Sequence, residues 1–387
     1  MSCASKHVAV LGSTGSIGVS TLEVIAASEG RLRAGLLSAH SQLDLLVRQA
    51  VRFRPDCVIA TDAEAAAAFD WSALPPGTEL LVGHEALERA VERPEIETVV
   101  AAIVGSAGLR STWAAISAGK TIALANKETL VMAGPLVTRL AEAKGARIVP
   151  VDSEHNAVFQ ALQCGRRHEV RRIILTASGG PFRDHSPEEL EHVTLADALH
   201  HPTWDMGPKI TIDSATMMNK ALEIIEARWL FGLEPEQIDV VIHPQSIVHS
   251  LVEFIDGAVV AVLGPPDMKL PIQYALDYPD RVAGIAPRLD LSRQLSLDFF
   301  PPDVERFPAL ELGLETAKSG GTAGVVLNAA NEAAVAGFRS GKLKFTEIVP
   351  ACRSVLASHT FETNPSLERL DQLDRWARQE VSRWVFT

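Results

Sequence analysis

A short apolar run that leads into a glycine-rich turn constrains the fold of this chain more than any other feature. His7 to Leu11 is mostly apolar, Gly12 to Gly18 reads Gly-Ser-Thr-Gly-Ser-Ile-Gly, and an apolar periodic segment follows through Ala26. A strand, a glycine turn and a helix in this order open a βαβ unit. The glycines let the backbone approach a pyrophosphate, and the N-terminus of the helix attracts its charge. This setting predicts a dinucleotide-binding sheet, although the Gly-x-x-Gly-x-x-Gly spacing is not the commonest one.

Further apolar runs, separated by helical segments, extend this unit into a parallel sheet. They lie at residues 55–60, 98–104, 119–125 and 146–151. Near-continuous apolar runs of this length are typical of parallel strands buried on both faces. Ligands of open α/β sheets bind at the carboxyl ends of the strands. The polar triplets Asn126 to Glu128 and Asp152 to Glu154 therefore lie where chemistry is expected.

The end of the second strand indicates which dinucleotide binds. An NAD site usually has Asp or Glu about 20 residues beyond the glycine turn, bonded to the ribose 2′-hydroxyl. Residues 34–41 contain no carboxylate. Basic or hydrogen-bonding side chains lie there or nearby instead: Arg31, Arg33, Ser38, His40 and Ser41. Because nothing in this segment repels a 2′-phosphate, it favours NADP(H) over NAD(H).

Asp152 and Glu154 are the first candidates for a metal site. Two residues apart on an extended strand end, their side chains would point the same way. Converging carboxylates are unfavourable unless a cation joins them. The alternative is that Asp152 or Ser153 caps a helix beginning near His155, which accounts for Ser153 well and for Glu154 less well.

The stretch from His201 to Glu226 has the second set of polar residues. A loop with one tryptophan precedes a β-leaning run at Lys209 to Ile212, and the pattern becomes helical from about Ser214. Asp213 and Ser214 are both residue types that cap helices. One face of that helix would carry Asn219, Glu223 and Glu226. The stretch suits a phosphate and a metal ion, and a capped amphipathic helix after a loop is the alternative.

The remaining segments complete the domain organisation. Arg171 to Ala177 is strand-like, and the Ser178-Gly179-Gly180 turn after it suits either a phosphate or an ordinary turn. Residues 185–199 are polar and helical, and residues 239–254 and 258–263 suggest two antiparallel strands around an Asp-Gly turn. Residues 280–302 are rich in Pro, Asp and Arg and indicate a linker. Helical patterns follow at 310–318, 324–339, 345–358 and 365–384, which predicts a separate helical C-terminal domain.

Length and composition exclude several protein classes. With 387 residues, 47% of them hydrophobic, the chain is expected to form two or three domains. A net charge of −12 argues against a nucleic-acid binder with a broad basic face. The four cysteines are widely separated, without a C-x-x-C pair: Cys3, Cys57, Cys164 and Cys352. No secretory or membrane-spanning run is evident, so we expect a soluble cytoplasmic protein with no membrane partner.

Several of these motifs, in this order, resemble the 1-deoxy-D-xylulose 5-phosphate reductoisomerase family. They include Gly12 to Gly18, Ala125 to Glu128, Asp152 to Glu154, Ser178 to Phe182, His201 to Gly207, Asp213 to Glu223, and Asn328 to Glu332. The resemblance covers nearly the whole chain. It implies an α/β protein with an N-terminal Rossmann-like NADPH-binding domain (1–152) and a central α/β catalytic domain (153–282) whose lid loop spans about 198–208. A linker (283–303) and a C-terminal helical bundle domain (304–387) would follow.

The resemblance also implies an activity. A divalent metal, Mg²⁺ or Mn²⁺, holds a phosphorylated ketose, 1-deoxy-D-xylulose 5-phosphate, while its carbon skeleton rearranges. NADPH then reduces the resulting aldehyde to 2-C-methyl-D-erythritol 4-phosphate, in the non-mevalonate route to isoprenoids. The family also implies a homodimer.

Residue roles follow from the same resemblance. Catalysis would involve Lys127, Asp152, Glu154 and Glu223, and the metal ligands would be Asp152, Glu154 and Glu223, whose oxygen atoms suit Mg²⁺ or Mn²⁺. The substrate phosphate would be held by Ser178, Ser214, Asn219 and Lys220. Other substrate contacts would be Lys127, Ser153, Glu154, Glu223, His201 and, on the mobile loop, Trp204. Cofactor contacts would be Thr14, Gly15, Ser16, Ile17, Ser38, His40, Asn126, Glu128, Met206 and Gly207.

The chain departs from the family pattern at two positions of the loop, and two other functions are alternatives. Asp205 stands where family members more often have a small neutral polar residue, and Pro208 where many have a basic one. A non-catalytic NADP-binding sensor should have lost at least one of the four proposed catalytic residues, and all four are present. A semialdehyde dehydrogenase usually needs a cysteine nucleophile. Cys164 is the only nearby candidate, and it lies in a polar helix end.

Overall fold

The computed structural model describes residues 5–384, and its chain divides into two compact units. The first unit runs to Thr129 and also contains Leu136–Asn156 and Asp267–Pro287. The second contains Leu130–Pro135, Ala157–Pro266 and the chain from Arg288 onward. Cys3, one of the four cysteines, lies outside the described residues. The three-domain division drawn from the sequence stays a prediction.

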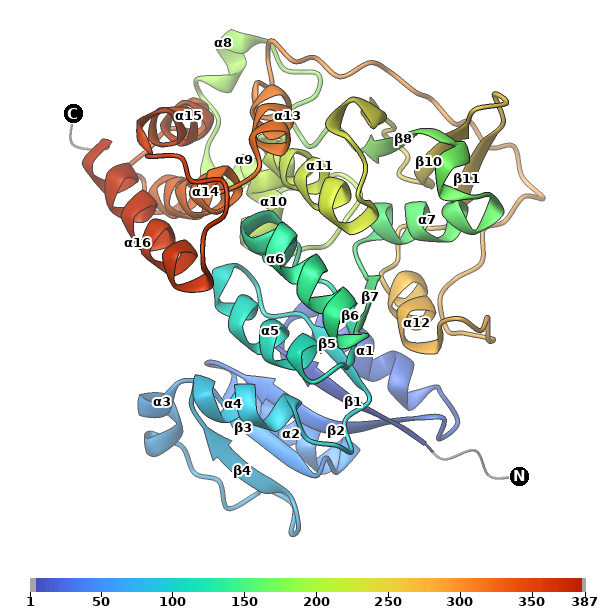
Figure 1. Cartoon of the computed structure of the whole chain (residues 1–387), viewed down its shortest axis with the longest axis vertical. Coiled ribbons are helices and arrows are strands. Elements are labelled where there is room, and N and C mark those ends of the chain that lie inside the picture. Colours follow the sequence, from blue (N-terminus) through green and yellow to red (C-terminus); the bar gives the residue numbers. More distant parts are fainter. Residues whose placement is uncertain (1–4, 385–387) are drawn as a thin grey trace. The chain divides into compact units, whose positions relative to one another are not determined.

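The first unit is built on a seven-stranded parallel sheet (Figure 1). The strands, in the order β4-β3-β2-β1-β5-β6-β7, are β1 (Lys6–Leu11), β2 (Leu32–Ala39), β3 (Cys57–Ala60), β4 (Glu79–Val82), β5 (Thr98–Ala101), β6 (Thr121–Leu124) and β7 (Arg147–Pro150). The strand order reverses beside β1, where Val10 pairs with Leu37 on one side and with Val100 on the other. Val8 to Leu11 are fully buried, so the apolar run of the sequence is the centre of this sheet.

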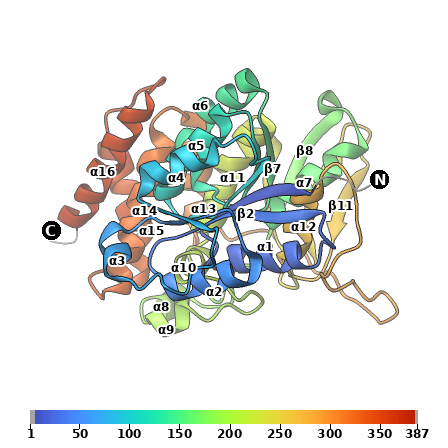
Figure 2. The same cartoon turned by 90° about the horizontal axis from the view of Figure 1, so that it is seen from below.

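Helices connect the strands of the first unit. They are α1 (Ser16–Ala26), α2 (Leu43–Phe53), α3 (Ala63–Ala68), α4 (His84–Val91), α5 (Leu109–Ser117), α6 (Glu128–Lys144) and α12 (Lys269–Asp277). Helix α12 comes from far along the sequence and packs on α1 (Figure 2). The Lys6 ammonium group donates a 2.8 Å hydrogen bond to the Leu276 carbonyl at its end. Helix α6 is kinked at Ala133, two residues before Pro135, and its kinked segment belongs to the second unit.

The second unit has a four-stranded mixed sheet and most of the remaining helices. Its strands, in the order β11-β10-β8-β9, are β8 (Val170–Ala177), β9 (Ile238–Ile242), β10 (Val248–Phe254) and β11 (Val259–Leu263). Its helices are most of α7 (Ser153–Ala161), α8 (Pro187–Leu190), α9 (Leu195–Ala198), α10 (Pro208–Ala215), α11 (Met218–Phe231), α13 (Ala309–Ser319), α14 (Ala323–Arg339), α15 (Ile348–Ser358) and α16 (Leu367–Trp384). Helix α13 packs on α11, where a Cβ atom at Gly313 would lie 2.6 Å from the Ala221 Cα.

The predicted α/β class, with a parallel Rossmann-like sheet and a helical C-terminal region, is confirmed. The prediction of a β-leaning run at Lys209 to Ile212 was wrong. Lys209 to Ile212 lie in helix α10, because Gly207 and Pro208 begin a helix whose buried side packs on α14. Residues 185–199, which were predicted to be helical, contain two short capped helices, and β4 and α12 were not predicted.

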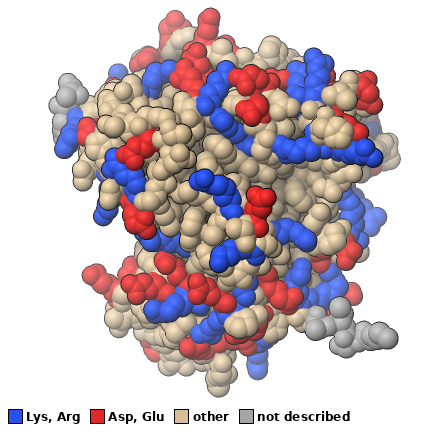
Figure 3. Space-filling view, in the orientation of Figure 1, with Lys and Arg blue, Asp and Glu red and all other residues tan. Residues whose placement is uncertain are grey.

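Two further features are the distribution of surface charge and the apolar character of the helices. On the face drawn in Figure 3, acidic and basic side chains are interspersed and no broad basic patch is seen. Among residues 5–384, no helix has the length and apolar character needed to cross a bilayer.

Candidate active site

The glycine turn between β1 and α1 has the geometry of an anion cradle. Gly12 has φ +74°, and a Cβ atom there would lie 2.8 Å from the Ala102 carbonyl oxygen. A Cβ atom at Gly18 would collide with the backbone of Gly12 and Ser13. Helix α1 begins after Gly15 without a side-chain cap, so its first N–H groups are not taken up by a capping side chain. An uncapped helix N-terminus after a close-packed glycine turn suits a pyrophosphate.

The residues proposed to contact the nucleotide at the end of β2 differ in their surroundings. Ser38 is buried, and its hydroxyl oxygen accepts a 3.1 Å hydrogen bond from the Gly12 N–H, so this side chain supports the glycine turn. His40 is largely exposed, with its Nδ1 atom 3.0 Å from the Thr61 hydroxyl and its Nε2 atom 3.9 Å from Asp62. Their roles in cofactor binding stay predictions.

Asn126 holds the loop that presents Lys127. Its amide donates to the carbonyls of Ile103 and Gly105, the latter at 2.9 Å. Its side-chain oxygen accepts a 2.9 Å hydrogen bond from the Thr129 N–H and thereby caps helix α6. These bonds fix the backbone on both sides of Lys127 and Glu128, both of which are buried.

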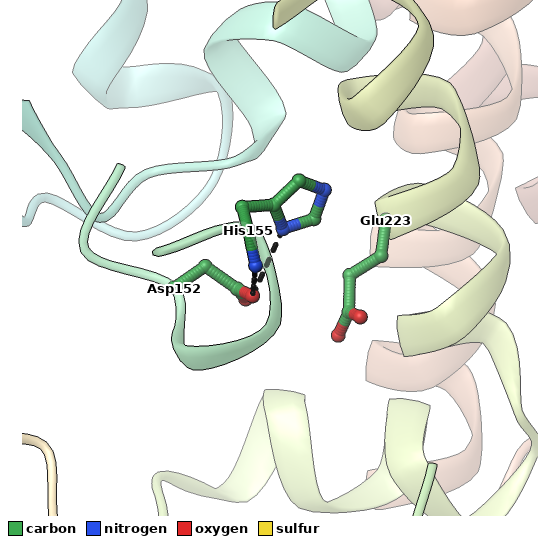
Figure 4. A group of neighbouring side chains, drawn as sticks. All are labelled: Asp152, His155 and Glu223. Carbon is green, nitrogen blue, oxygen red and sulfur yellow. Dashed lines mark hydrogen bonds and ion pairs between the residues drawn. The ribbon is translucent and has the colours of Figure 1, made fainter. Parts of the chain in front are cut away.

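Asp152 is the centre of a compact cluster at the end of β7. One carboxylate oxygen lies 2.6 Å from the Lys127 ammonium nitrogen, and the other lies 2.9 Å from Nδ1 of the fully buried His155 (Figure 4). The second oxygen also accepts from the backbone N–H groups of Glu154 and His155, at 3.2 and 3.4 Å, and so caps helix α7. The capping alternative is thus correct for Asp152. The same carboxylate also forms an ion pair with Lys127.

Glu154 is placed differently from the sequence expectation. It lies in the first turn of α7 rather than on an extended strand end, because the helix begins at Ser153. The Ser153 hydroxyl donates a hydrogen bond to its carboxylate. Both side chains are partly exposed next to Asp152. The first unit therefore brings together Lys127, Asp152, Ser153 and Glu154.

In the second unit, the predicted single helix is an elbow between two helices. Helix α10 ends at Ala215, Met217 has φ +62°, and helix α11 starts at Met218. Ser214 therefore lies near the end of α10, whereas Asn219 and Lys220 lie in the first turn of α11. The prediction that Asp213 or Ser214 caps the second helix was wrong, because the chain is already helical from Pro208.

The first turn of α11 carries a buried carboxylate with two donors. The Asn219 amide nitrogen lies 2.5 Å from one Glu223 oxygen, and the Lys220 ammonium group is paired with the other oxygen. Lys220 and Glu223 are almost completely buried. The predicted i, i+4 neighbourhood of Asn219 and Glu223 is confirmed, and the lysine supplies a positive charge beside the carboxylate.

The Ser178-Gly179-Gly180 turn lies against α10. Gly180 has φ +68°, and a Cβ atom there would lie 2.7 Å from the Ser214 carbonyl oxygen. This close approach brings the turn after β8 to the end of α10. It places the predicted phosphate residues Ser178 and Ser214 on adjoining segments.

His201 sets the orientation of the Ser178 hydroxyl. Its Nδ1 atom accepts hydrogen bonds from the backbone N–H groups of Thr203 and Trp204, at 3.1 and 2.9 Å. The proton of the neutral ring is therefore on Nε2, which lies 3.0 Å from the Ser178 oxygen and donates to it. Burial lowers the pKa of His201 to about 4, which keeps the ring neutral. Because the Gly180 N–H also donates to that oxygen, at 3.2 Å, the Ser178 O–H is directed outward as a donor.

Comparison with known proteins decides the family. The family model described as 1-deoxy-D-xylulose 5-phosphate reductoisomerase matches residues 8–134. Models described as the C-terminal domain of the same reductoisomerase match residues 148–231 and 263–380. The chain belongs to the 1-deoxy-D-xylulose 5-phosphate reductoisomerase family.

Named relatives and solved structures of the family match over nearly the full length. The 1-deoxy-D-xylulose 5-phosphate reductoisomerase of Thermomicrobium roseum is 53% identical over 98% of this chain and 97% of its own length. That of Heliobacterium modesticaldum is 51% identical over 98% and 97%. A DOX-P reductoisomerase structure in complex with NADPH, fosmidomycin and magnesium superposes with a TM-score of 0.92 at 42% identity, covering 98% of both chains. The enzyme from Zymomonas mobilis in complex with NADPH has a TM-score of 0.90 at 42% identity, covering 98% of this chain and 99% of its own.

The structure gives two residues contacts that the sequence patterns did not predict. His155 contacts Asp152, and the buried Asn331 contacts Asp213. His155 follows the Asp-Ser-Glu triplet directly, so its position one turn after Asp152 was a signal available in the sequence. Nothing in the sequence relates Asn331 to Asp213, because 118 residues separate them.

Proposed function

We propose that this chain converts 1-deoxy-D-xylulose 5-phosphate to 2-C-methyl-D-erythritol 4-phosphate, with NADPH as the hydride donor and Mg²⁺ or Mn²⁺ as the metal. The observation that carries the proposal is the family relationship itself: relatives about half identical, over at least 96% of this chain, bear this enzyme's name. The four proposed catalytic residues, Lys127, Asp152, Glu154 and Glu223, are all present in this sequence. An isomerisation followed by a reduction is the reaction class that the name describes.

The metal would be held by Asp152, Glu154 and Glu223. Asp152 and Glu223 carry oxygen donors of the kind that Mg²⁺ and Mn²⁺ prefer, and His155 carries a nitrogen donor beside Asp152. Each carboxylate has a lysine ammonium group beside it, Lys127 at Asp152 and Lys220 at Glu223. Bound there, the cation would supply Lewis-acid polarisation of the substrate carbonyl.

The residues of the chain divide the remaining work. Lys127 lies beside Asp152 with its ammonium group held at 2.6 Å, so it can donate a proton or a hydrogen bond to a substrate oxygen at that end of the site. The outward O–H of Ser178 and the ammonium group of Lys220 would bind the phosphate, together with Ser214 and Asn219. The loop carrying Trp204, tied by its backbone to His201, would exclude water from the reacting carbons.

NADPH would occupy the turn between β1 and α1. The glycine turn admits a pyrophosphate at the N-terminus of α1, and Thr14 to Ile17 lie on its accessible side. Met206 and Gly207, next to the start of α10, would approach the nicotinamide. The bound cofactor supplies the hydride for the reduction step.

The test is NADPH oxidation by the purified protein with 1-deoxy-D-xylulose 5-phosphate, with and without Mg²⁺ or Mn²⁺. We expect turnover only when ketose phosphate and metal are both present, and 2-C-methyl-D-erythritol 4-phosphate as the product by mass spectrometry. Metal-independent turnover would contradict the role of the three carboxylates. Complete inactivity of a folded, NADPH-binding protein would contradict the proposed function.

A homodimer is the assembly that we propose. Strand β11 is an edge of the mixed sheet, and an unpaired edge is a template for pairing with another chain. Large apolar side chains are exposed on this edge and on the linker: Ile255, Val259, Leu263, Leu291 and Phe300. Light scattering should give the mass of a dimer, and Val259→Lys, which charges the edge, should shift it towards the monomer. A monomeric wild type would refute the assembly. A cytoplasmic location is a separate proposal.

A further inference from the structure

Helix α14 carries two fully buried asparagines that have no part in the reaction described so far. Asn328 and Asn331 are the first and fourth residues of the Asn-Ala-Ala-Asn-Glu motif in the sequence. The Asn328 amide donates a 2.9 Å hydrogen bond to Glu332, which is paired with Arg378 of α16. Asn331 faces a different element. Its amide donates a 2.9 Å hydrogen bond to Asp213 of α10.

The contact between Asn331 and Asp213 has a defined direction. A carboxylate only accepts hydrogen bonds, so the amide nitrogen of Asn331 must face it. The amide oxygen of Asn331 then points away and has no protein partner among residues 5–384. The amide oxygen of Asn328 likewise has no partner among the described residues, but the hydrogen bond of Asn328 stays within α14. Asn331 differs because its hydrogen bond joins α14 to α10.

Asp213 connects the two ends of α10. Its second carboxylate oxygen lies 2.8 Å from the Lys209 ammonium group, one turn earlier and next to the end of the predicted lid loop. The next residue, Ser214, lies against the Gly180 turn that adjoins Ser178. Asp213 itself is 1% exposed, so its charge is stabilised by Asn331 and Lys209 rather than by water.

Helix stability does not account for the pair of Lys209 and Asp213. A cation in the first turn of a helix, with its acidic partner four residues later, is opposed by the helix dipole. Cys352 of α15 lies within reach of this charge. Burial raises the pKa of its thiol, and the negative charge of Asp213 raises it further. The Asp213 carboxylate therefore lies between Asn331 of α14 and Lys209 at the start of α10, one residue before Ser214.

We infer that Asn331 is a positioning residue for the substrate phosphate. By holding Asp213, it fixes α10, and with it Lys209 at the lid end and Ser214 at the Ser178 turn. This inference rests on the proposed function, because it assigns the α10–α11 elbow to phosphate binding. The C-terminal helical segment then contributes to substrate affinity through one hydrogen bond, without touching the substrate.

The experiment compares Asn331→Leu with the matched control Asn328→Leu. Both asparagines are on α14, both are fully buried and both donate one hydrogen bond to a carboxylate, but only Asn331 bonds to Asp213. KM for 1-deoxy-D-xylulose 5-phosphate, kcat, NADPH affinity and Tm are measured for each. We expect Asn331→Leu to raise KM about tenfold, with kcat and NADPH affinity nearly unchanged. Asn328→Leu should lower Tm and leave KM near the wild-type value.

An exchange variant keeps the test informative if Asn331→Leu folds poorly. Asn331→Asp places two carboxylates against each other, whereas the double variant Asp213→Asn/Asn331→Asp restores one donor and one acceptor. KM should rise in the single variant and fall back towards wild type in the double variant. Equal KM values in the two leucine variants, or no recovery in the exchange, would overturn the inference. A wild type that does not turn over the ketose phosphate would instead refute the proposed function.

Discussion

Replacing Gly180 by alanine should weaken substrate binding through a displacement that the structure allows to be estimated. Gly180 has φ +68°, where an L-residue is strained by about 1–2 kcal/mol. The new Cβ atom would also lie 2.7 Å from the Ser214 carbonyl oxygen, where 3.4 Å begins ordinary contact. The turn or the end of α10 must therefore retreat by about 0.7 Å, and overpacking of this kind costs about 1–3 kcal/mol.

These two terms set the expected sizes. Together they lower the free energy of unfolding by about 2–5 kcal/mol, which corresponds to a fall in Tm of roughly 5–15 °C for a unit of this size. The Ser178 hydroxyl is two residues away and moves with the turn. Because a misplacement of 1 Å can cost about 100-fold in rate, a smaller displacement should cost about tenfold in kcat/KM for 1-deoxy-D-xylulose 5-phosphate.

The chain offers a matched control at Gly257. Its φ of +88° is as unfavourable for alanine as that of Gly180, but a Cβ atom there would have nothing within 4 Å. Gly257→Ala should therefore lose only the stability that the backbone strain costs, and its kcat/KM should stay at the wild-type value. Steady-state assays and calorimetry on both variants separate strain from close approach. If the two variants had the same Tm and the same kcat/KM, the contact of the Gly180 turn with α10 would not matter to the site, and the reasoning would be refuted.

Three further predictions concern single residues. His201 has a folded-state pKa of about 4, below its ordinary 6.5, so its neutral form contributes stability that is present above pH 6.5 and lost as the pH falls towards 4. Calorimetry should show the wild type losing more Tm across that window than His201→Gln, and equal losses would contradict the assignment. Glu223→Gln should lower kcat about 100-fold while NADPH still binds by fluorescence titration, whereas loss of NADPH binding would mean a structural role. Lys220→Ala should raise KM for the ketose phosphate, and an unchanged KM would exclude Lys220 from the phosphate site.

The parts of the fold that could be predicted are those with a strong local signal. The buried strands of the parallel sheet are short apolar runs, and four of them end in the glycine turn or a polar segment that marks their carboxyl ends. The four C-terminal helices have clear periodicity, and each was placed to within a few residues. Strand β4 was missed because Glu79 to Val82 is a four-residue, partly exposed edge strand whose apolar run is only three residues long. Helix α12 was not predicted; it is a nine-residue helix with Pro271 in its first turn.

The candidate site could be predicted as a set of residues but not as an arrangement. Asp152 and Glu154 were proposed as ligands from an extended strand, yet the chain turns helical at Ser153 and uses Asp152 as the cap. A capping residue and a metal ligand are both short oxygen-bearing side chains, so the pattern alone does not separate them. The Asn331 contact depends on tertiary packing across 118 residues, for which one sequence carries no signal.

The elbow at Met217 gives the proposed phosphate residues an arrangement that a single helix could not provide. On one continuous helix, Ser214 and Asn219 would be five residues apart and would point about 140° away from each other around the axis. On the single helix that the sequence predicted, Ser214 and Asn219 could therefore not hold one phosphate together. The left-handed backbone of Met217, at φ +62°, ends α10 and starts α11 in a new direction. Such a conformation costs about 1–2 kcal/mol for a non-glycine residue, and strain of this kind persists where the surrounding packing holds it. Met217 is 3% exposed, and Asp213, in the helix before it, is held by Asn331. Burial of Met217 therefore holds the elbow that sets the direction of Asn219 relative to Ser214.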